Sequence, residues 1–293
     1  MDFSRYWASR QKQVDTALDR LLPRASTRPK TIHEAMRYSI FAGGKRLRPV
    51  ITLAAAEVVG GKTEAALPLA CAVECIHTYS LIHDDLPAMD NDDFRRGKPT
   101  SHKVYGEGIA ILAGDALLTI AFEMVAGAKP SPRYSSAALV KELAHASGSQ
   151  ALVAGQVADL EGEGRKLKLS DLQYIHENKT AALITSSIRL GAMSANATPK
   201  KLAGLTEFGL SLGLAFQVID DILDVTQTTE KLGKSAGKDI AAQKATYPAL
   251  LGLEKAKKEA DRLTDRARAA LKPFGKDAAP LAAIADYLLK REN

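Results

Sequence analysis

The chain has 293 residues, of which 46% are hydrophobic, 25% are charged and 5% are aromatic, and its net charge is +6. This length is enough for one large domain or two modest ones. The mild charge and the lack of a long Lys/Arg block argue against a dedicated nucleic-acid binder. The positive excess fits either a solvated basic surface or an anionic substrate.

The cysteines and the N-terminal residues bear on the compartment. Cys71 and Cys75 are four residues apart in an apolar helical pattern without zinc-binding partners, so we interpret them as core residues of a reduced, intracellular protein. The polar, charged stretch from Met1 to Arg20 indicates no signal peptide. No run of 18 apolar residues exists, so we expect no membrane span and a cytoplasmic protein.

Helical periodicity dominates from the N-terminus onward. Apolar residues at helical spacing within Val14–Leu22 predict a first helix that ends before Pro23. A second helix is expected over Ile32–Ala42. Thr31 is its predicted N-cap, and Glu34 would complete a capping box.

Glycine and proline mark the next boundaries. Gly43-Gly44 is expected to end the second helix, and Pro49 to start a third helix that ends at Gly60-Gly61. The further expected helices are Leu67–Asp85, Ile109–Gly127, Ser135–Leu160 as one helix or a pair, Asp171–Ala192 with Ser170 as its cap, Leu202–Val225, Tyr247–Leu271 and Ala278–Leu289. Strand alternation and internal repeats are missing, so we predict one all-α domain over residues 1–293 with roughly ten or more helices. Surplus apolar helix faces favour a homodimer.

Two aspartate-rich clusters carry the strongest chemical signal. The first is Asp84-Asp85-Leu-Pro-Ala-Met-Asp90, and the second is Asp220-Asp221-Ile-Leu-Asp224. Unpaired charge against apolar helices is strongly unfavourable, and carboxylate-only clusters suit Mg²⁺, which shares its remaining positions with water and substrate phosphates. The two clusters therefore predict an enzyme that binds a diphosphate or polyphosphate.

The local sequence places each cluster. Pro87 cannot donate a hydrogen bond to the preceding turn, so the first helix should end near its aspartate pair, and Asp90 should return from the following turn. Asp220 and Asp224 are spaced i, i+4 and share a helix face. Two such helices packed antiparallel would face their carboxylates across one cavity. Alone, the first cluster would also suit a solvated acidic loop.

Several cations are candidates for binding phosphates. Gly44, Lys45 and Arg48 lie in a glycine turn at a helix start, where free N–H groups suit a phosphate, although a C-cap followed by surface charges fits the same residues. Arg95 and Arg96 follow the acidic turn, and each could bind phosphate oxygens or pair with neighbouring aspartates. The remaining candidates are Lys179-Thr180, Lys234 and Lys244 beside the loop after the second cluster, and His77, two turns before the first cluster.

These motifs resemble those of the short-chain trans-isoprenyl diphosphate synthases, most closely the bacterial farnesyl diphosphate synthases. The similarity begins near Leu22 and lies in Gly43–Pro49, His77–Asp90 with the following Arg-Arg-Gly, Gly155-Gln156 with Asp159, Lys179-Thr180, and Phe216-Gln217 before the second acidic cluster. The resemblance implies an all-helical homodimer around a deep central cavity. It also implies condensation of isopentenyl diphosphate with dimethylallyl and geranyl diphosphates.

The resemblance further implies a role for each candidate. Isopentenyl diphosphate would be held by Gly44, Lys45, Arg48, His77 and Arg96. The allylic diphosphate would be gripped by about three Mg²⁺, with Mn²⁺ possible, on Asp84, Asp85, Asp90, Asp220, Asp221 and Asp224. That grip would be completed by Arg95, Lys179, Lys234 and Lys244, while Thr180 and Gln217 would direct oxygen lone pairs at the developing allylic cation. The departed pyrophosphate would take the proton.

One helix is expected to set product length. An isoprene unit is roughly 5 Å long, about one helical turn, and the growing tail should run toward the N-terminal end of the first aspartate helix. Ser80, one turn before Asp84, is small, whereas Tyr79 is bulky and is predicted to form the floor. In the resembling family an aromatic residue here stops growth at fifteen carbons, so farnesyl diphosphate is the expected product.

Other classes of protein fit less well. A geranylgeranyl diphosphate synthase shares every motif except the floor and is the main alternative. A terpene cyclase would replace the second acidic cluster with an Asn/Ser/Glu motif, and a non-catalytic partner subunit would lose aspartates or Lys45 and Arg48. A plain helical scaffold leaves both acidic clusters unexplained. We also expect the loop over Thr226–Thr246 to close over the site.

Overall fold

The computed structural model describes residues 2–226 and 245–289, and helices make up most of them. The elements are α1 (Phe3–Leu21), α2 (Lys30–Ile40), α3 (Leu47–Val59), α4 (Thr63–Asp84), β1 (Phe94–Arg95), β2 (Lys98–Pro99), α5 (Ser101–Tyr105), α6 (Glu107–Ala126), α7 (Ser136–Ser147), α8 (Leu152–Gly162), α9 (Leu169–His176), η1 (Glu177–Ala181), α10 (Ala182–Ser194), α11 (Pro199–Thr226), α14 (Tyr247–Leu251), α15 (Leu253–Leu271), η2 (Lys272–Ala278) and α16 (Ala279–Leu289). The predicted all-α class is confirmed. Lys234, Lys244 and most of the loop expected to close over the site lie outside the described residues.

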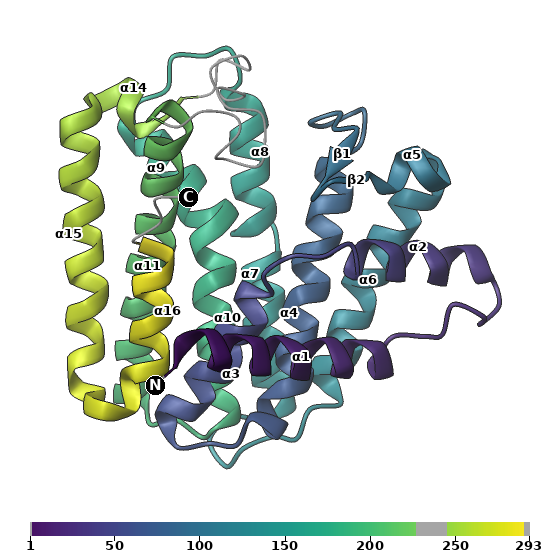
Figure 1. Ribbon diagram of the computed structural model, residues 1–293, viewed down its shortest axis with the longest axis horizontal. Coiled ribbons are helices and arrows are strands. Elements are labelled where there is room, and N and C mark those ends of the chain that lie inside the picture. The colour runs from purple at the N-terminus through teal and green to yellow at the C-terminus, as the bar shows by residue number, and fades with distance from the viewer. Residues whose placement is uncertain (1, 227–244, 290–293) are drawn as a thin grey trace.

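Two long helices organise the bundle. The helix α4 packs against α3 and α6, and α11 packs against α10 and α15. Figure 1 shows α1 and α2 crossing one side of the bundle, α15 and α16 on its left, and the β1–β2 hairpin, α8 and α14 at its upper end. Both acidic clusters follow from this arrangement, because each lies in the C-terminal turns of one of the two long helices or just after them.

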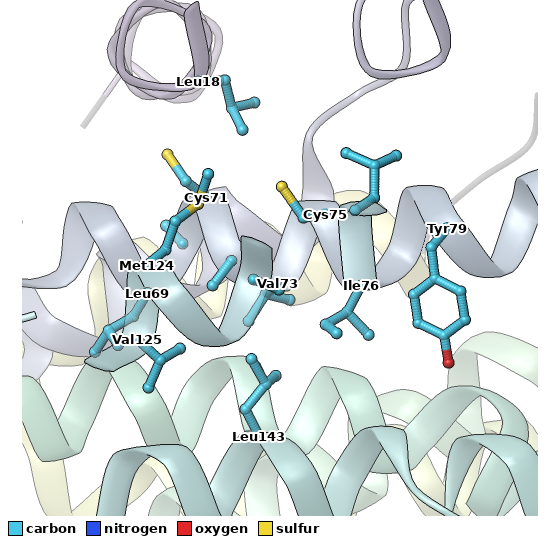
Figure 2. Close-up of a cluster of buried hydrophobic side chains, with 14 of the residues drawn as sticks. Leu18, Leu69, Cys71, Val73, Cys75, Ile76, Tyr79, Met124, Val125 and Leu143 are labelled. Atoms are coloured by element: carbon cyan, nitrogen blue, oxygen red, sulfur yellow. The ribbon is translucent and has the colours of Figure 1, made fainter. Parts of the chain in front are cut away.

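The core around α4 has two sides. Val73 and Ile76 are fully buried on one side, and Cys71 and Cys75 point from the other side toward Leu18 of α1 (Figure 2). Both cysteines are free thiols, and burial raises the pKa of Cys71 to about 12. Their interpretation as core residues is therefore confirmed.

Two predicted helix caps are wrong. The helix α2 begins at Lys30 with Pro29 before it, so Thr31 lies inside the first turn and makes no cap. Proline has no N–H to leave unsatisfied, which suits it to the start of a helix. At α9 the N-cap is Lys168 and not Ser170. The carboxylate of Asp171 accepts the backbone N–H of Lys168 at 2.9 Å. A charged acceptor makes the stronger hydrogen bond at a helix N-terminus.

Two expected helices are interrupted, and the stretch Ser135–Leu160, expected as one helix or a pair, is the pair α7 and α8. The stretch Asp171–Ala192 passes from α9 through one π-helical turn, η1, into α10. The stretch Tyr247–Leu271 breaks at Gly252, whose φ of 82° favours glycine.

A short hairpin is present where no strand was expected. Phe94 pairs with Pro99, and Arg95 pairs with Lys98. Arg96 and the following glycine form its turn, with φ values of 54° and 74°. Two consecutive positive φ values are the geometry that tight two-residue hairpins require. The hairpin matters because it carries both arginines of the Arg-Arg-Gly motif.

By length and composition alone, three helices in the described part of the chain are long and apolar enough to cross a membrane, although the sequence holds no unbroken apolar run of that length. They are α4, α6 and α11. In this fold α4 and α6 pack against each other, and α11 packs between α10 and α15.

Candidate active site

The helix α4 ends where its acidic cluster begins. Asp84 is its last residue, and Asp85 is its C-cap. The chain then folds back, because the N–H of Asp90 donates to the carbonyl of Asp84 at 2.8 Å and the N–H of Asp92 donates to that of Asp85 at 3.2 Å. Asp90 thus returns from the turn beside the helix end.

Residues of both acidic clusters line one polar cavity of about 400 Å³. Asp84 and Asp90 border it from the first cluster, and Asp220 and Asp221 from the second. The other polar lining residues are Arg95, Asp159, Glu163, His176, Lys179, Thr180 and Gln217. Like charges of two helix ends therefore face the same space, where a multivalent cation or cationic side chains must offset them.

The carboxylates border the cavity without converging on a point. Among the described residues, no three His, Cys, Asp or Glu side chains lie close enough to hold a metal ion by themselves. Asp84 forms no side-chain hydrogen bond or ion pair with the residues that the structure describes. Burial raises the pKa of Asp84 to about 6, with Lys179 opposing the shift and Asp90 adding to it. An oxygen-only donor set of this kind fits Mg²⁺ shared with a phosphate ligand.

Asp85 turns away from the polar cavity. Its carboxylate accepts two hydrogen bonds from Nε of Arg95, at 2.7 and 2.9 Å, and Nη2 of Arg95 lies 2.6 Å from Oδ1. Arg95 also lies 3.7 Å from Asp92. Burial raises the pKa of Asp85, and the hydrogen bonds from Arg95 oppose that shift. Arg95 therefore borders the cavity with its charge partly engaged by its own acidic turn.

The π-helical turn brings two side chains to the cavity. Lys179 and Thr180 both lie in η1 and line it. Nζ of Lys179 donates to Oδ2 of Asp159 on α8 at 2.7 Å. A Cβ at Gly155 would collide with the backbone nitrogen of Lys179, so only glycine allows α8 to approach η1 this closely. Gln217 reaches the cavity from α11.

Three residues of the site had no role predicted from the sequence: Tyr247 and His176, which lie beside Asp221, and Asp159, which pairs with Lys179. The backbone N–H of Tyr247 donates to Oδ2 of Asp221 at 2.9 Å, and Nε2 of His176 lies 3.9 Å from Oδ1 of the same carboxylate. Burial lowers the pKa of His176 to about 4, so its imidazole is neutral at pH 7. Asp159 was noted as part of a motif, but its partner Lys179 is 20 residues away. Asp224, 4% exposed, does not line the cavity.

A second cavity, of about 470 Å³, adjoins the first and is mostly apolar. Its walls include Leu152, Val153, Val157, Leu160, Leu183 and Met89, together with Tyr79, Ser80 and Gln156. The two cavities share Leu81, Asp84, Lys179 and Thr180. A ligand with a charged head and an apolar tail would find its two environments in these adjoining cavities.

The first turn of α3 and the helix α4 contribute basic residues to the lining of the apolar cavity. Arg48 and His77 line that cavity. Burial lowers the pKa of Arg48 to about 10, and Nε of Arg48 makes no hydrogen bond with the described residues. Burial, followed by Arg48 and Arg96, holds the pKa of His77 well below its usual range, so its imidazole is neutral. Lys45 lies 5.4 Å from the ring centroid of Tyr287.

Gly44 is required by its surroundings. Its φ is 115°, and a Cβ there would collide with the guanidinium of Arg96. Nη1 of Arg96 donates to the carbonyl of Gly43. The hairpin and the glycine loop are thus in direct contact through Arg96. Gly44, Lys45 and Arg96 line neither of the two cavities.

The chain matches known proteins over nearly all of its length. The family model described as Polyprenyl synthetase matches residues 29–278. The chain is 52% identical to "Heterodimeric geranylgeranyl pyrophosphate synthase large subunit 1, chloroplastic" of Arabidopsis thaliana, over 100% of this chain and 80% of that protein. It is 49% identical to a dimethylallyltranstransferase of Fischerella ambigua, over 98% of this chain and 83% of that protein.

Solved structures give the same result. A putative farnesyl-diphosphate synthase from Marinomonas sp. MED121 superposes with a TM-score of 0.85 and 40% identity, over 99% of this chain and 100% of that one. An FPP/GFPP synthase from Zymomonas mobilis has a TM-score of 0.85 and 36% identity, over 98% of this chain and 99% of that one. The all-α fold is that of the isoprenoid synthases. The chain belongs to the polyprenyl synthetase family, and its relatives are short-chain prenyl diphosphate synthases, which confirms the resemblance. Some relatives are named chloroplastic, so the compartment stays a prediction.

Proposed function

We propose that this protein condenses isopentenyl diphosphate with dimethylallyl and then geranyl diphosphate, and that it stops at farnesyl diphosphate. The observation that carries the proposal is that an acidic cavity and an apolar cavity adjoin each other and share Asp84, Lys179 and Thr180. The prenyltransfer chemistry is that of the family. The assignment of each residue and of the product is our inference.

The allylic substrate would place its diphosphate in the polar cavity and its tail in the apolar one. Mg²⁺ would be held by Asp84, Asp90 and Asp220, with Asp85, Asp221 and Asp224 supporting the two helix ends. When bound, Mg²⁺ neutralises the charge that develops on departing pyrophosphate. Lys179 and Arg95 contribute cationic hydrogen-bond donors to the same oxygens. Lys234 and Lys244, outside the described residues, would add to them.

Isopentenyl diphosphate would bind where Arg48 and His77 line the apolar cavity. Arg48 presents an Nε without a protein partner among the described residues, and the neutral His77 can donate one N–H. Lys45, Arg96 and the backbone of Gly44 would complete this half-site. Buried cations without an anion are costly, so a diphosphate that pairs with them is bound strongly.

The reaction needs little further protein chemistry. The allylic C–O bond breaks, and its electron pair leaves with pyrophosphate. The double bond of isopentenyl diphosphate attacks the allylic carbon, and the proton that the new cation loses goes to a pyrophosphate oxygen. Oxygen lone pairs of Thr180 and Gln217 would stabilise the cation, while the apolar walls exclude water, which would capture it.

The product length rests on Tyr79, which lines the apolar cavity and is 7% exposed. Geranylgeranyl diphosphate is the second candidate, because several relatives about 50% identical to this chain are named geranylgeranyl synthases.

A product assay tests both the proposed condensation reaction and the proposed chain length of its product. Purified protein is incubated with Mg²⁺, isopentenyl diphosphate and either dimethylallyl or geranyl diphosphate, and the dephosphorylated products are measured by mass spectrometry. We expect fifteen-carbon product from both primers and none after chelation of the metal. Twenty-carbon product would reject the floor assignment, and no product would reject the enzyme.

We also propose that two copies associate through α6. Ile111 and Leu112 are 43% and 54% exposed, and only 39% of the most apolar stretch of α6 is buried. An exposed apolar face of this kind marks an interaction surface, and two copies can bury the same patch around a two-fold axis. Leu112→Glu is expected to convert a dimer into a monomer in light scattering, whereas Leu210→Glu on α11 should not. A monomeric unmodified protein would reject the dimer.

A further inference from the structure

Arg46 lies between two proposed substrate-binding residues yet lines neither cavity. It is 4% exposed, and it precedes α3 as its N-cap with a φ of 51°. This left-handed conformation is unfavourable for a residue that carries a side chain. The sequence therefore keeps arginine at a strained position, and its buried contacts must offset the strain.

The guanidinium of Arg46 ties the glycine loop to three helices. Nε donates to Oδ1 of Asp15 on α1 at 2.8 Å, and Nη1 donates to Oε1 of Glu74 on α4 at 2.9 Å. Nη2 donates to the carbonyl of Ile40, the last residue of α2, at 2.7 Å. The carbonyl of Gly43 lies 3.5 Å from Nη1 and also accepts from Arg96. Loop, hairpin and three helices thus meet at one side chain.

Glu74 is the buried carboxylate of this network. Its side chain is 2% exposed, as buried as the guanidinium that it pairs with. It lies one turn before His77 on α4, and its charge also opposes the lowering of the pKa of Arg48 and of Arg96. The negative charge of Glu74 therefore offsets the repulsion among neighbouring arginines, although Glu74 itself lines neither cavity.

We propose that the Arg46–Glu74 ion pair is a positioning device for the isopentenyl diphosphate half-site, an inference that rests on the proposed function. The pair fixes the glycine loop at the start of α3, the helix from which Arg48 lines the apolar cavity. It contacts neither the allylic cavity nor the reacting carbons. Loss of the ion pair should therefore weaken the binding of isopentenyl diphosphate and leave the binding of the allylic substrate nearly unchanged.

Steady-state kinetics and calorimetry test this with Glu74→Gln, which keeps the shape and removes the charge. We expect KM for isopentenyl diphosphate to rise about tenfold to a hundredfold, with KM for geranyl diphosphate nearly unchanged, because small displacements of binding groups have effects of this size. Binding of isopentenyl diphosphate alone, measured by titration calorimetry, should weaken in parallel. Asp15→Asn, on the half-exposed arm of the network, should act in the same direction and is the milder variant.

A control variant distinguishes a positioning role from a general loss of stability. Glu142→Gln breaks the partly buried ion pair with Arg189, between α7 and α10, and should leave both KM values unchanged. The inference is overturned if Glu74→Gln and Asp15→Asn leave KM for isopentenyl diphosphate unchanged, or if both substrates weaken equally. An inactive unmodified protein would instead reject the proposed function, so the two failures are distinguishable.

Discussion

Replacing Asp84 by asparagine is expected to lower kcat for the condensation about a thousandfold, the effect of removing one group that stabilises charge in the transition state. Asp84 borders both cavities and forms no side-chain hydrogen bond or ion pair with the described residues, so its carboxylate is available to a bound cation. Asparagine keeps the shape but loses the charge. Rates measured at saturating Mg²⁺ and substrates check the prediction.

The stability of the same variant should not fall. Burial, the largest effect, and Asp90 disfavour the negative charge of Asp84, whereas Lys179 favours it. The balance raises its pKa to about 6, so removing the charge relieves a net cost. Sites built for function often reduce stability in this way. We therefore expect the Tm of Asp84→Asn, measured without Mg²⁺, to equal or exceed that of the unmodified protein.

A matched control lies nearby in the same acidic turn. Asp93 is exposed and forms a surface ion pair with Lys103 at 2.8 Å. Such exposed pairs contribute little to stability, so Asp93→Asn should change neither Tm nor kcat substantially. If Asp84→Asn keeps most of its activity, or if both variants lose it equally, Asp84 does not bind the catalytic metal.

The long helices were predictable because each has an apolar period and a proline or glycine near its ends. The features that could not be predicted from the sequence depend on tertiary packing. The π-helical turn at Lys179 leaves no local signature, and it fits because Gly155 lets the backbone of α8 approach it. The β1–β2 hairpin is too short to show alternation.

The residues of the site also fall into those that the sequence predicts and those that only the fold brings together. The two acidic clusters were predictable because each is contiguous, and the meeting of their residues at one cavity follows from helix packing. Partners across the fold were not predictable, such as Asp159 for Lys179 or Glu74 for Arg46. The sequence left open whether Arg95 pairs with acidic neighbours, and the structure pairs it with Asp85.

Replacing Tyr79 by alanine is expected to move the main product from fifteen to twenty carbons. The ring of Tyr79 extends on the same side of α4 as Val73 and Ile76, which are fully buried (Figure 2). Among the residues of α4, only His77 and positions C-terminal to it line the apolar cavity. Removing the ring opens space toward Ile76, about one helical turn away and roughly the length of one isoprene unit.

That geometry limits the extension to one unit. Ile76 is the next closed layer below Tyr79, so Tyr79→Ala should give twenty carbons without much longer chains. Adding Ile76→Ala should then allow a further unit. Each truncation costs roughly 3 kcal/mol of stability, so both proteins are assayed well below their Tm.

Two controls isolate the role of the ring. Tyr79→Phe keeps the ring and should keep the fifteen-carbon product, and Tyr174→Ala removes an exposed tyrosine from α9 and should also keep it. Mass spectrometry of dephosphorylated products gives chain length directly. Unchanged length in Tyr79→Ala would place the floor on another wall of the cavity. Leu152 and Leu183 would then be the residues to test, because they line the same cavity from α8 and α10.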